Sequence, residues 1–123
     1  MRIFKSRWFQ RFARKEGIAD AALREAVARA EKGQIDADLG GEVIKQRIAR
    51  PGQGRSKGYR TIILLRRGGK AFFEYGFAKS QRANIDDDEK EKYKEAAKHV
   101  LALTEKHLGE LLKRGDFVEV KSE

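Results

Sequence analysis

The chain has 123 residues, 40% of them hydrophobic, which is enough for one modest core, so we expect a single domain over residues 1–123. It has no Cys and two His, which excludes a disulfide framework, a thiolate metal site and a His-based metal cluster, and we expect no metal or cofactor. The net charge is +9, and no apolar run is long enough for a signal peptide or a membrane span, so the sequence predicts a cytoplasmic protein with a polyanionic partner.

The basic charge is concentrated in one part of the chain. Residues 45–82 carry 11 Lys or Arg and a single acid, Glu74, whereas residues 86–123 carry 8 basic and 11 acidic residues. Solubility alone would tolerate interspersed acids, so we interpret the basic stretch as a nucleic-acid-binding surface rather than a merely solvated one.

The first part of the chain predicts two short helices followed by strands. Aromatic side chains recur at steps of four from Phe4 to Phe12, which predicts a helix over 3–17. Asp20 is placed to cap a second helix over 21–32. The next elements are a loop over 34–41, a strand over 43–49 with a basic exposed face, a Gly-rich loop over 50–58, and two strands over 59–67 and 70–78 joined by a Gly68-Gly69 turn.

The last part of the chain predicts a long helix and a C-terminal extension. Asp86 and Glu89 stand at capping-box spacing and open the helix. Gly109 is expected to split off a short last helix, and residues 117–120 predict an edge strand, within an extension from about 104 to 123. The fold class is therefore α+β, with two N-terminal helices and a C-terminal helix packed on a small antiparallel sheet. We expect the helices to cover one side of this sheet.

The candidate site follows from the adjacency of two strands. Because the strands over 59–67 and 70–78 are antiparallel neighbours, we expect Arg60 to converge with residues 77–79. Cleavage of RNA without metal needs a base for the 2′-OH, a stabiliser for the phosphorane and an acid for the leaving oxygen. We expect Arg60 and Arg82 to stabilise charge and Lys79 to exchange a proton if neighbouring cations lower its pKa. The expected RNA-binding residues are Lys45, Arg47, Arg55, Lys57 and Phe77.

Several of these residues also have plainer interpretations. Phe77 taken alone is better explained by core packing, and a solvent loop over 50–58 is the less favoured alternative to a loop that follows a phosphodiester chain. His99 and His107 lie in the acidic helical half, where surface or packing roles are favoured over acid–base chemistry. The run Asp86 to Glu89 is better explained as a helix cap than as a metal site.

An ordered set of short motifs resembles one known family. The set resembles the RelE/HigB branch of type II toxins, within the RelE/ParE superfamily, over nearly the whole chain up to about Leu103. Its members are Trp8-Phe9, Ile35 to Gly41, Lys45 to Pro51, Gly58-Tyr59-Arg60-Thr61-Ile62-Ile63, Ala71-Phe72-Phe73 and Tyr75 to Lys79.

The resemblance implies translation-dependent mRNA cleavage in the ribosomal A site, inhibition of translation, a cognate antitoxin and autoregulation of a shared operon. Arg60 matches the Arg of the family's Gly-Tyr-Arg motif, associated with phosphate stabilisation, and Lys57 matches a basic loop position. Lys79 and Arg82 fall in the family's basic segment after the last strand. Many relatives carry a Tyr near position 86, which is Asp here, so the general base stays unassigned and Phe77 or Tyr93 would substitute only in stacking.

Two other functions are consistent with the same features. One is a ParE-like toxin that poisons DNA gyrase by a protein contact without catalysis, since related folds serve both purposes. The other is a non-catalytic RNA-binding module. The basic loop beside Arg60 favours RNA cleavage, because a gyrase-binding protein needs no convergent phosphate site.

Overall fold

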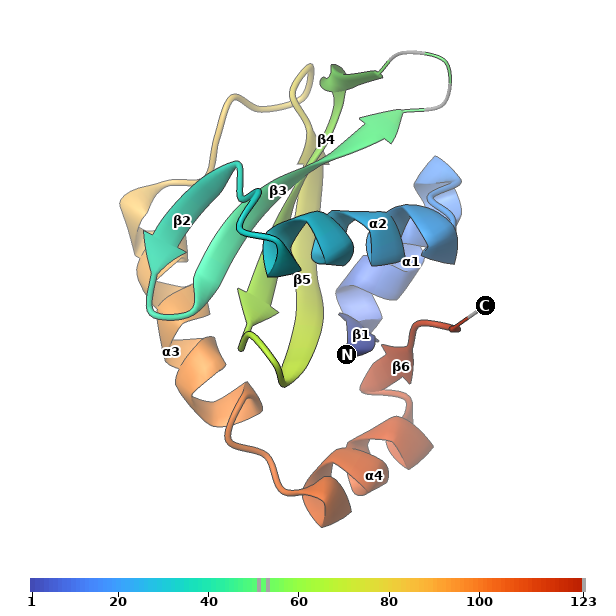
Figure 1. The fold of residues 1–123 in the computed structure, drawn as a ribbon, viewed down its shortest axis with the longest axis vertical. Coiled ribbons are helices and arrows are strands. Elements are labelled where there is room, and N and C mark those ends of the chain that lie inside the picture. Colours follow the sequence, from blue (N-terminus) through green and yellow to red (C-terminus); the bar gives the residue numbers. More distant parts are fainter. Residues whose placement is uncertain (51, 53, 123) are drawn as a thin grey trace.

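The computed structural model describes residues 1–50, 52 and 54–122, which form an α+β fold around a single sheet. The elements are β1 (Arg2–Ser6), α1 (Arg7–Glu16), α2 (Asp20–Glu31), β2 (Ala37–Gly40), β3 (Val43–Arg50), β4 (Gly54–Leu65), β5 (Lys70–Ala78), α3 (Asp87–Val100), α4 (Glu105–Arg114) and β6 (Phe117–Glu119). The strands lie in the order β2-β3-β4-β5-β1-β6, and all neighbours are antiparallel except β1 and β5 (Figure 1).

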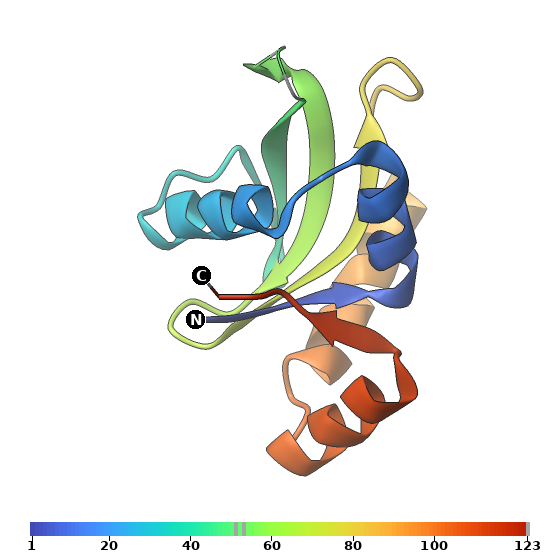
Figure 2. The same cartoon turned by 90° about the vertical axis from the view of Figure 1, so that its right-hand side faces the viewer.

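Helices cover both faces of the sheet, whereas the sequence predicted covering on one side. Helices α1 and α2 pack on one face through a core that includes Phe9, Leu23, Ile63 and Phe73. Helix α3 packs on the other face, which we call the α3 face, and α4 lies beyond its lower end (Figure 2). The core on the α3 face includes Phe4, Ile62, Phe72, Ala97 and Leu108.

The first predicted helix was wrong in its first turn, which is strand β1. Residues 3–6 are all buried, and β1 pairs in parallel with β5 and in antiparallel with β6. Two strand partners satisfy the backbone there and override the helical spacing of the aromatic side chains. The helix begins at Arg7, where the Ser6 side chain accepts a hydrogen bond from the Phe9 N–H at 3.1 Å.

Two other expected boundaries and one expected helix cap are corrected by the structure. The predicted loop over 34–41 contains β2, an edge strand paired with β3. Strand β4 begins at Gly54, so the Gly-rich loop is shorter than 50–58. Asp20 does not cap α2; its carboxylate accepts from Lys5 Nζ at 2.9 Å, and that contact ties α2 to β1.

The C-terminal part is integrated into the sheet through β6. The capping box of Asp86 and Glu89 is confirmed, with both reciprocal hydrogen bonds present. The helical break lies between Val100 and Glu105, not at Gly109, because Thr104 caps α4 by accepting from the His107 N–H at 3.1 Å. No helix in the described part of the chain has the length and apolarity to span a bilayer.

A bulge at Glu74 shifts the side-chain alternation of β5. Ile62 pairs with Tyr75 and Ile63 with Phe73, so Glu74 is the extra residue. The sequence alternation placed Phe73, Tyr75 and Phe77 on one face; instead Tyr75 and Phe77 pack in the core on the α3 face, and Phe73 packs under α1 and α2. The bulge therefore brings Tyr75 onto the same face as the predicted cationic residues.

Candidate nucleic-acid interface

Three basic side chains lie close together on the α3 face of strands β3 and β4. Lys45 and Arg47 alternate along β3 with Ile44 and Ile48, which pack on the opposite face. Arg47 is directly opposite Arg60 of β4. Directly opposite side chains on a sheet face lie only about 5 Å apart at Cβ, and like charges so placed repel each other. This part of the sheet therefore favours an anion between the strands.

Arg60 is the most unusual member of this cluster. The residue is only 7% exposed, and its Nη1 is buried without a hydrogen-bond partner among the described residues. None of the ion pairs in the described part of the chain includes it. A buried donor without an acceptor costs about 1–3 kcal/mol, so the fold tolerates an unfavourable group here. Such a group is well suited to a phosphate oxygen that is present only with substrate.

Lys45, the lysine of this cluster, has a lowered pKa. Burial lowers its pKa most, and the nearby charges of Arg60, Arg47 and Lys90 lower it further. Its Nζ donates to Asn84 Oδ1 at 3.2 Å. Lys45, which the sequence placed only among the RNA-binding residues, therefore releases a proton more readily than an ordinary lysine.

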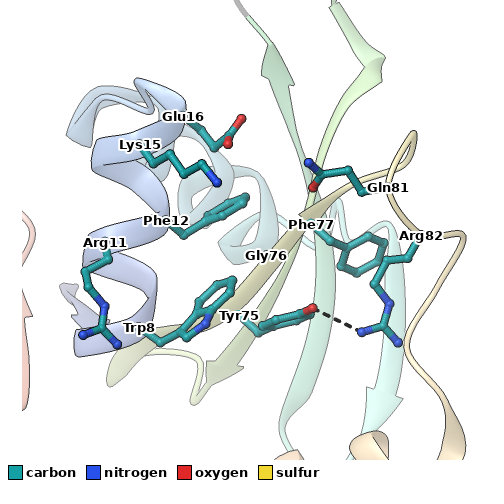
Figure 3. A pocket seen from close by; sticks show the side chains of 10 residues that line it. All are labelled: Trp8, Arg11, Phe12, Lys15, Glu16, Tyr75, Gly76, Phe77, Gln81 and Arg82. Carbon is teal, nitrogen blue, oxygen red and sulfur yellow. Dashed lines mark hydrogen bonds between the residues drawn. The ribbon is translucent and has the colours of Figure 1, made fainter.

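Arg82 is held by contacts that the sequence did not predict. Its guanidinium donates to both carboxylate oxygens of Glu89, at 2.6 and 3.1 Å, and to the Tyr75 hydroxyl at 3.1 Å, as the dashed line in Figure 3 shows. It also lies 5.6 Å from the centre of the Phe77 ring. Because Glu89 stands in the first turn of α3, this contact fixes the start of α3 to the end of β5.

The predicted convergence of Arg60 with the end of β5 is confirmed at the backbone. Arg60 is directly opposite Phe77, so Arg60 and Arg82 both lie beside Phe77. Lys79 follows β5 immediately and is exposed. Arg60 itself is more covered than a phosphate-binding arginine was expected to be.

The other predicted RNA-binding residues fall in different environments. Phe77 is 2% exposed, so its ring belongs to the core and no base can stack on it in this conformation. Lys57 is exposed on β4, and the side chain of Arg55 lies outside the described part of the structure. Arg47 is exposed on β3.

Glu74 was missed as a site residue, and Tyr75 and Tyr93 were considered only for stacking on a base. The rings of Tyr75 and Tyr93 stack at 6.2 Å between centres, and burial raises the pKa of the Tyr93 hydroxyl above its usual value. Burial also raises the pKa of Glu74 to about 7. The bulge at Glu74 brings Tyr75 to the α3 face, and nothing in the local sequence signals a bulge.

Neither histidine forms a hydrogen bond or ion pair with this cluster among the described residues. His99 and His107 are exposed on α3 and α4, and His99 lies 3.3 Å from Glu95 on its own helix. Within the described residues, no group of three His, Cys, Asp or Glu side chains is arranged to hold a metal ion.

Comparison with known proteins identifies one family. A family described as the RelE toxin of the RelE / RelB toxin-antitoxin system matches residues 1–120, which is nearly the entire chain. Searches of curated proteins and of solved structures found no significant match.

Proposed function

Because the chain belongs to the RelE toxin family of toxin–antitoxin systems, we propose that it is a ribosome-dependent endoribonuclease that cleaves mRNA in the ribosomal A site. The observation that carries this proposal is the buried Arg60 guanidinium, which has no anionic partner among the described residues and lies opposite a second cation, Arg47. A phosphodiester supplies the missing negative charge.

The reaction assigned to the site needs no metal. The ribose 2′-OH attacks the adjacent phosphorus, the bond to the 5′-oxygen breaks, and the products are a 2′,3′-cyclic phosphate and a free 5′-OH. Arg60 stabilises the charge on the phosphorane. Lys45, with its lowered pKa, is our candidate for proton transfer to or from the reacting oxygens.

The other cations have supporting roles in this proposal. Lys57, Lys79 and Arg55 bind flanking phosphates, which lie along one extended strand of RNA. Arg82 is a positioning residue, because its guanidinium is already shared between Glu89 and Tyr75. Because Arg60 is buried, the groups that cover it have to shift before a phosphodiester reaches it.

The test is cleavage of a defined message on purified translating ribosomes in buffer that contains EDTA. We expect cuts within A-site codons, a loss of at least a hundredfold in rate for Arg60→Met, and no loss for the control Arg67→Met. Arg67 is an exposed arginine in the turn between β4 and β5, at the other end of the same hairpin. Equal rates for wild type and Arg60→Met would refute the assignment.

Two other outcomes would point to different functions. Growth arrest with a DNA-damage response and intact messages would indicate a gyrase-directed toxin. Binding to message without cleavage would indicate a non-catalytic RNA-binding module.

Family membership implies an antitoxin partner. We propose that it binds the basic surface with an acidic segment, because opposite charges steer such complexes together. Binding of the antitoxin that weakens steeply with added salt, and weakens further in Arg47→Ala, is the expected result.

A further inference from the structure

A separate pocket opens between helix α1 and the upper part of β5. It has a volume of about 390 Å³ and is lined from α1 by Trp8, Phe12 and Lys15 and from the other side by Tyr75 and the segment that follows β5. The pocket exists because β1 pairs with β5 only as far as Phe73, after which the chain turns away into α1. Figure 3 shows the two walls facing each other across this gap.

We propose that this pocket holds one unpaired nucleobase of the RNA substrate, next to the phosphodiester that is cleaved; the inference rests on the proposed RNA cleavage. Trp8 carries the argument. It is 41% exposed, although the other large aromatic side chains of the chain are buried or partly covered. Single-stranded RNA is commonly bound by aromatic faces of this kind.

The neighbours of Trp8 hold its ring in a fixed orientation. The ring stacks on Phe12 with 5.3 Å between centres and a 16° angle, and it lies 4.6 Å from the Tyr75 ring. Phe12 is itself fixed on Gly76, where a Cβ would lie 2.6 Å from the Phe12 ring. A base that stacks on the exposed part of Trp8 therefore meets a ring that is already held in place. Binding then costs little of the side-chain entropy of Trp8.

The charge around the pocket suits a nucleotide better than an apolar peptide side chain. Lys15 extends from α1 toward the gap, and the amide of Gln81 points into it from the opposite wall (Figure 3). Glu16 is the one acid in the lining, and it is outnumbered there by Arg11, Lys15 and Arg82. The lining thus offers cations for a phosphate and an amide for a base edge, with a net positive charge.

The pocket adjoins the proposed cleavage site through Phe77. Arg82 and Phe77 line it, and Phe77 is directly opposite Arg60 on the sheet. Tyr75 contributes its ring to the pocket and its hydroxyl to Arg82. We place the phosphate of a base bound against Trp8 on the side of the pocket that Arg82 and Phe77 line.

Trp8 is the only tryptophan in the chain, so its fluorescence reports directly on the pocket. The probe is a 2′-O-methyl adenosine trinucleotide, which lacks the attacking hydroxyl. We expect saturable quenching by the trinucleotide in the full-length protein. With a labelled trinucleotide followed by anisotropy, we expect at least tenfold weaker binding for Trp8→Ala, a smaller loss for Trp8→Phe and weaker binding for Lys15→Ala. The control Arg14→Ala, on the same helix and outside the lining, should bind as wild type does.

The outcomes separate this inference from the proposed function. Absence of quenching, or equal binding by Trp8→Ala and wild type, overturns the pocket assignment even if the protein cleaves message on ribosomes. Quenching by an acidic peptide but not by the trinucleotide also overturns it and assigns the pocket to a protein partner. Saturable binding that needs Trp8 supports the pocket even if no cleavage is found, because the assay contains no ribosome and requires no catalysis.

Discussion

Replacing Arg60 by methionine should stabilise the protein while abolishing its activity. The Nη1 of Arg60 is buried and has no hydrogen-bond partner in the described part of the chain, and such a donor costs about 1–3 kcal/mol. Repulsion from Arg47 directly opposite adds roughly 0.2–1 kcal/mol. Methionine has a similar length, fills the same space and removes both penalties. We therefore expect Arg60→Met to raise the free energy of unfolding by about 1–3 kcal/mol, or the melting temperature by roughly 3–5 °C per kcal/mol.

Urea unfolding at neutral pH measures this change directly. Arg67→Met is the matched control, and its effect should stay within about 0.5 kcal/mol because Arg67 is exposed. Inorganic phosphate should stabilise the wild type by mass action and leave Arg60→Met unaffected. A loss of more than about 1 kcal/mol in Arg60→Met would show that Arg60 supports the fold, and the anion-site reasoning would then fail.

Three further predictions concern neighbouring groups. Gly76→Ala should lower the free energy of unfolding by about 1–3 kcal/mol, seen as a lower urea midpoint, because the new Cβ would lie 2.6 Å from the Phe12 ring; an unchanged midpoint would contradict this packing. Burial raises the pKa of Glu74 from 4.5 to about 7, so the folded state holds this proton more tightly than the unfolded state. The contribution of Glu74 to stability should therefore be highest below pH 4.5 and fall by about 1–3 kcal/mol as pH rises to 7. Glu74→Gln should remove this fall in urea titrations, and a persisting fall would assign it to another group. The pKa of Lys45, followed by NMR of its side-chain carbons, should rise in Arg60→Met because a nearby positive charge is gone; an equal or lower pKa would exclude Arg60 as a cause.

Local signals in the sequence predicted the parts of the fold that depend on neighbouring residues. The capping box of Asp86 and Glu89 and the turn at Gly68 are determined within a few positions, and both are present. The approach of Arg60 to the end of β5 was also predictable, because a tight hairpin fixes the register of its two strands.

The features that the sequence did not predict depend on distant partners. Residues 3–6 have the spacing of a helix and become a strand only because β5 and β6 pair with them. The pair of Arg82 with Glu89 requires α3 to return to the end of β5, and the bulge at Glu74 reverses the expected faces of that strand. Trp8 was noted as part of a helical stripe, but its exposure depends on β1 ending beside β5.

The position of β1 between β5 and β6 also has a consequence for biosynthesis. This strand is synthesised well before the segments that pair with it, residues 70–73 and 117–119. Until they arrive, the apolar side chains of Ile3 and Phe4 have no sheet to enter. The nascent chain therefore exposes this apolar segment until its partner strands are made. During that period chaperones or an early-binding partner decide between folding and aggregation.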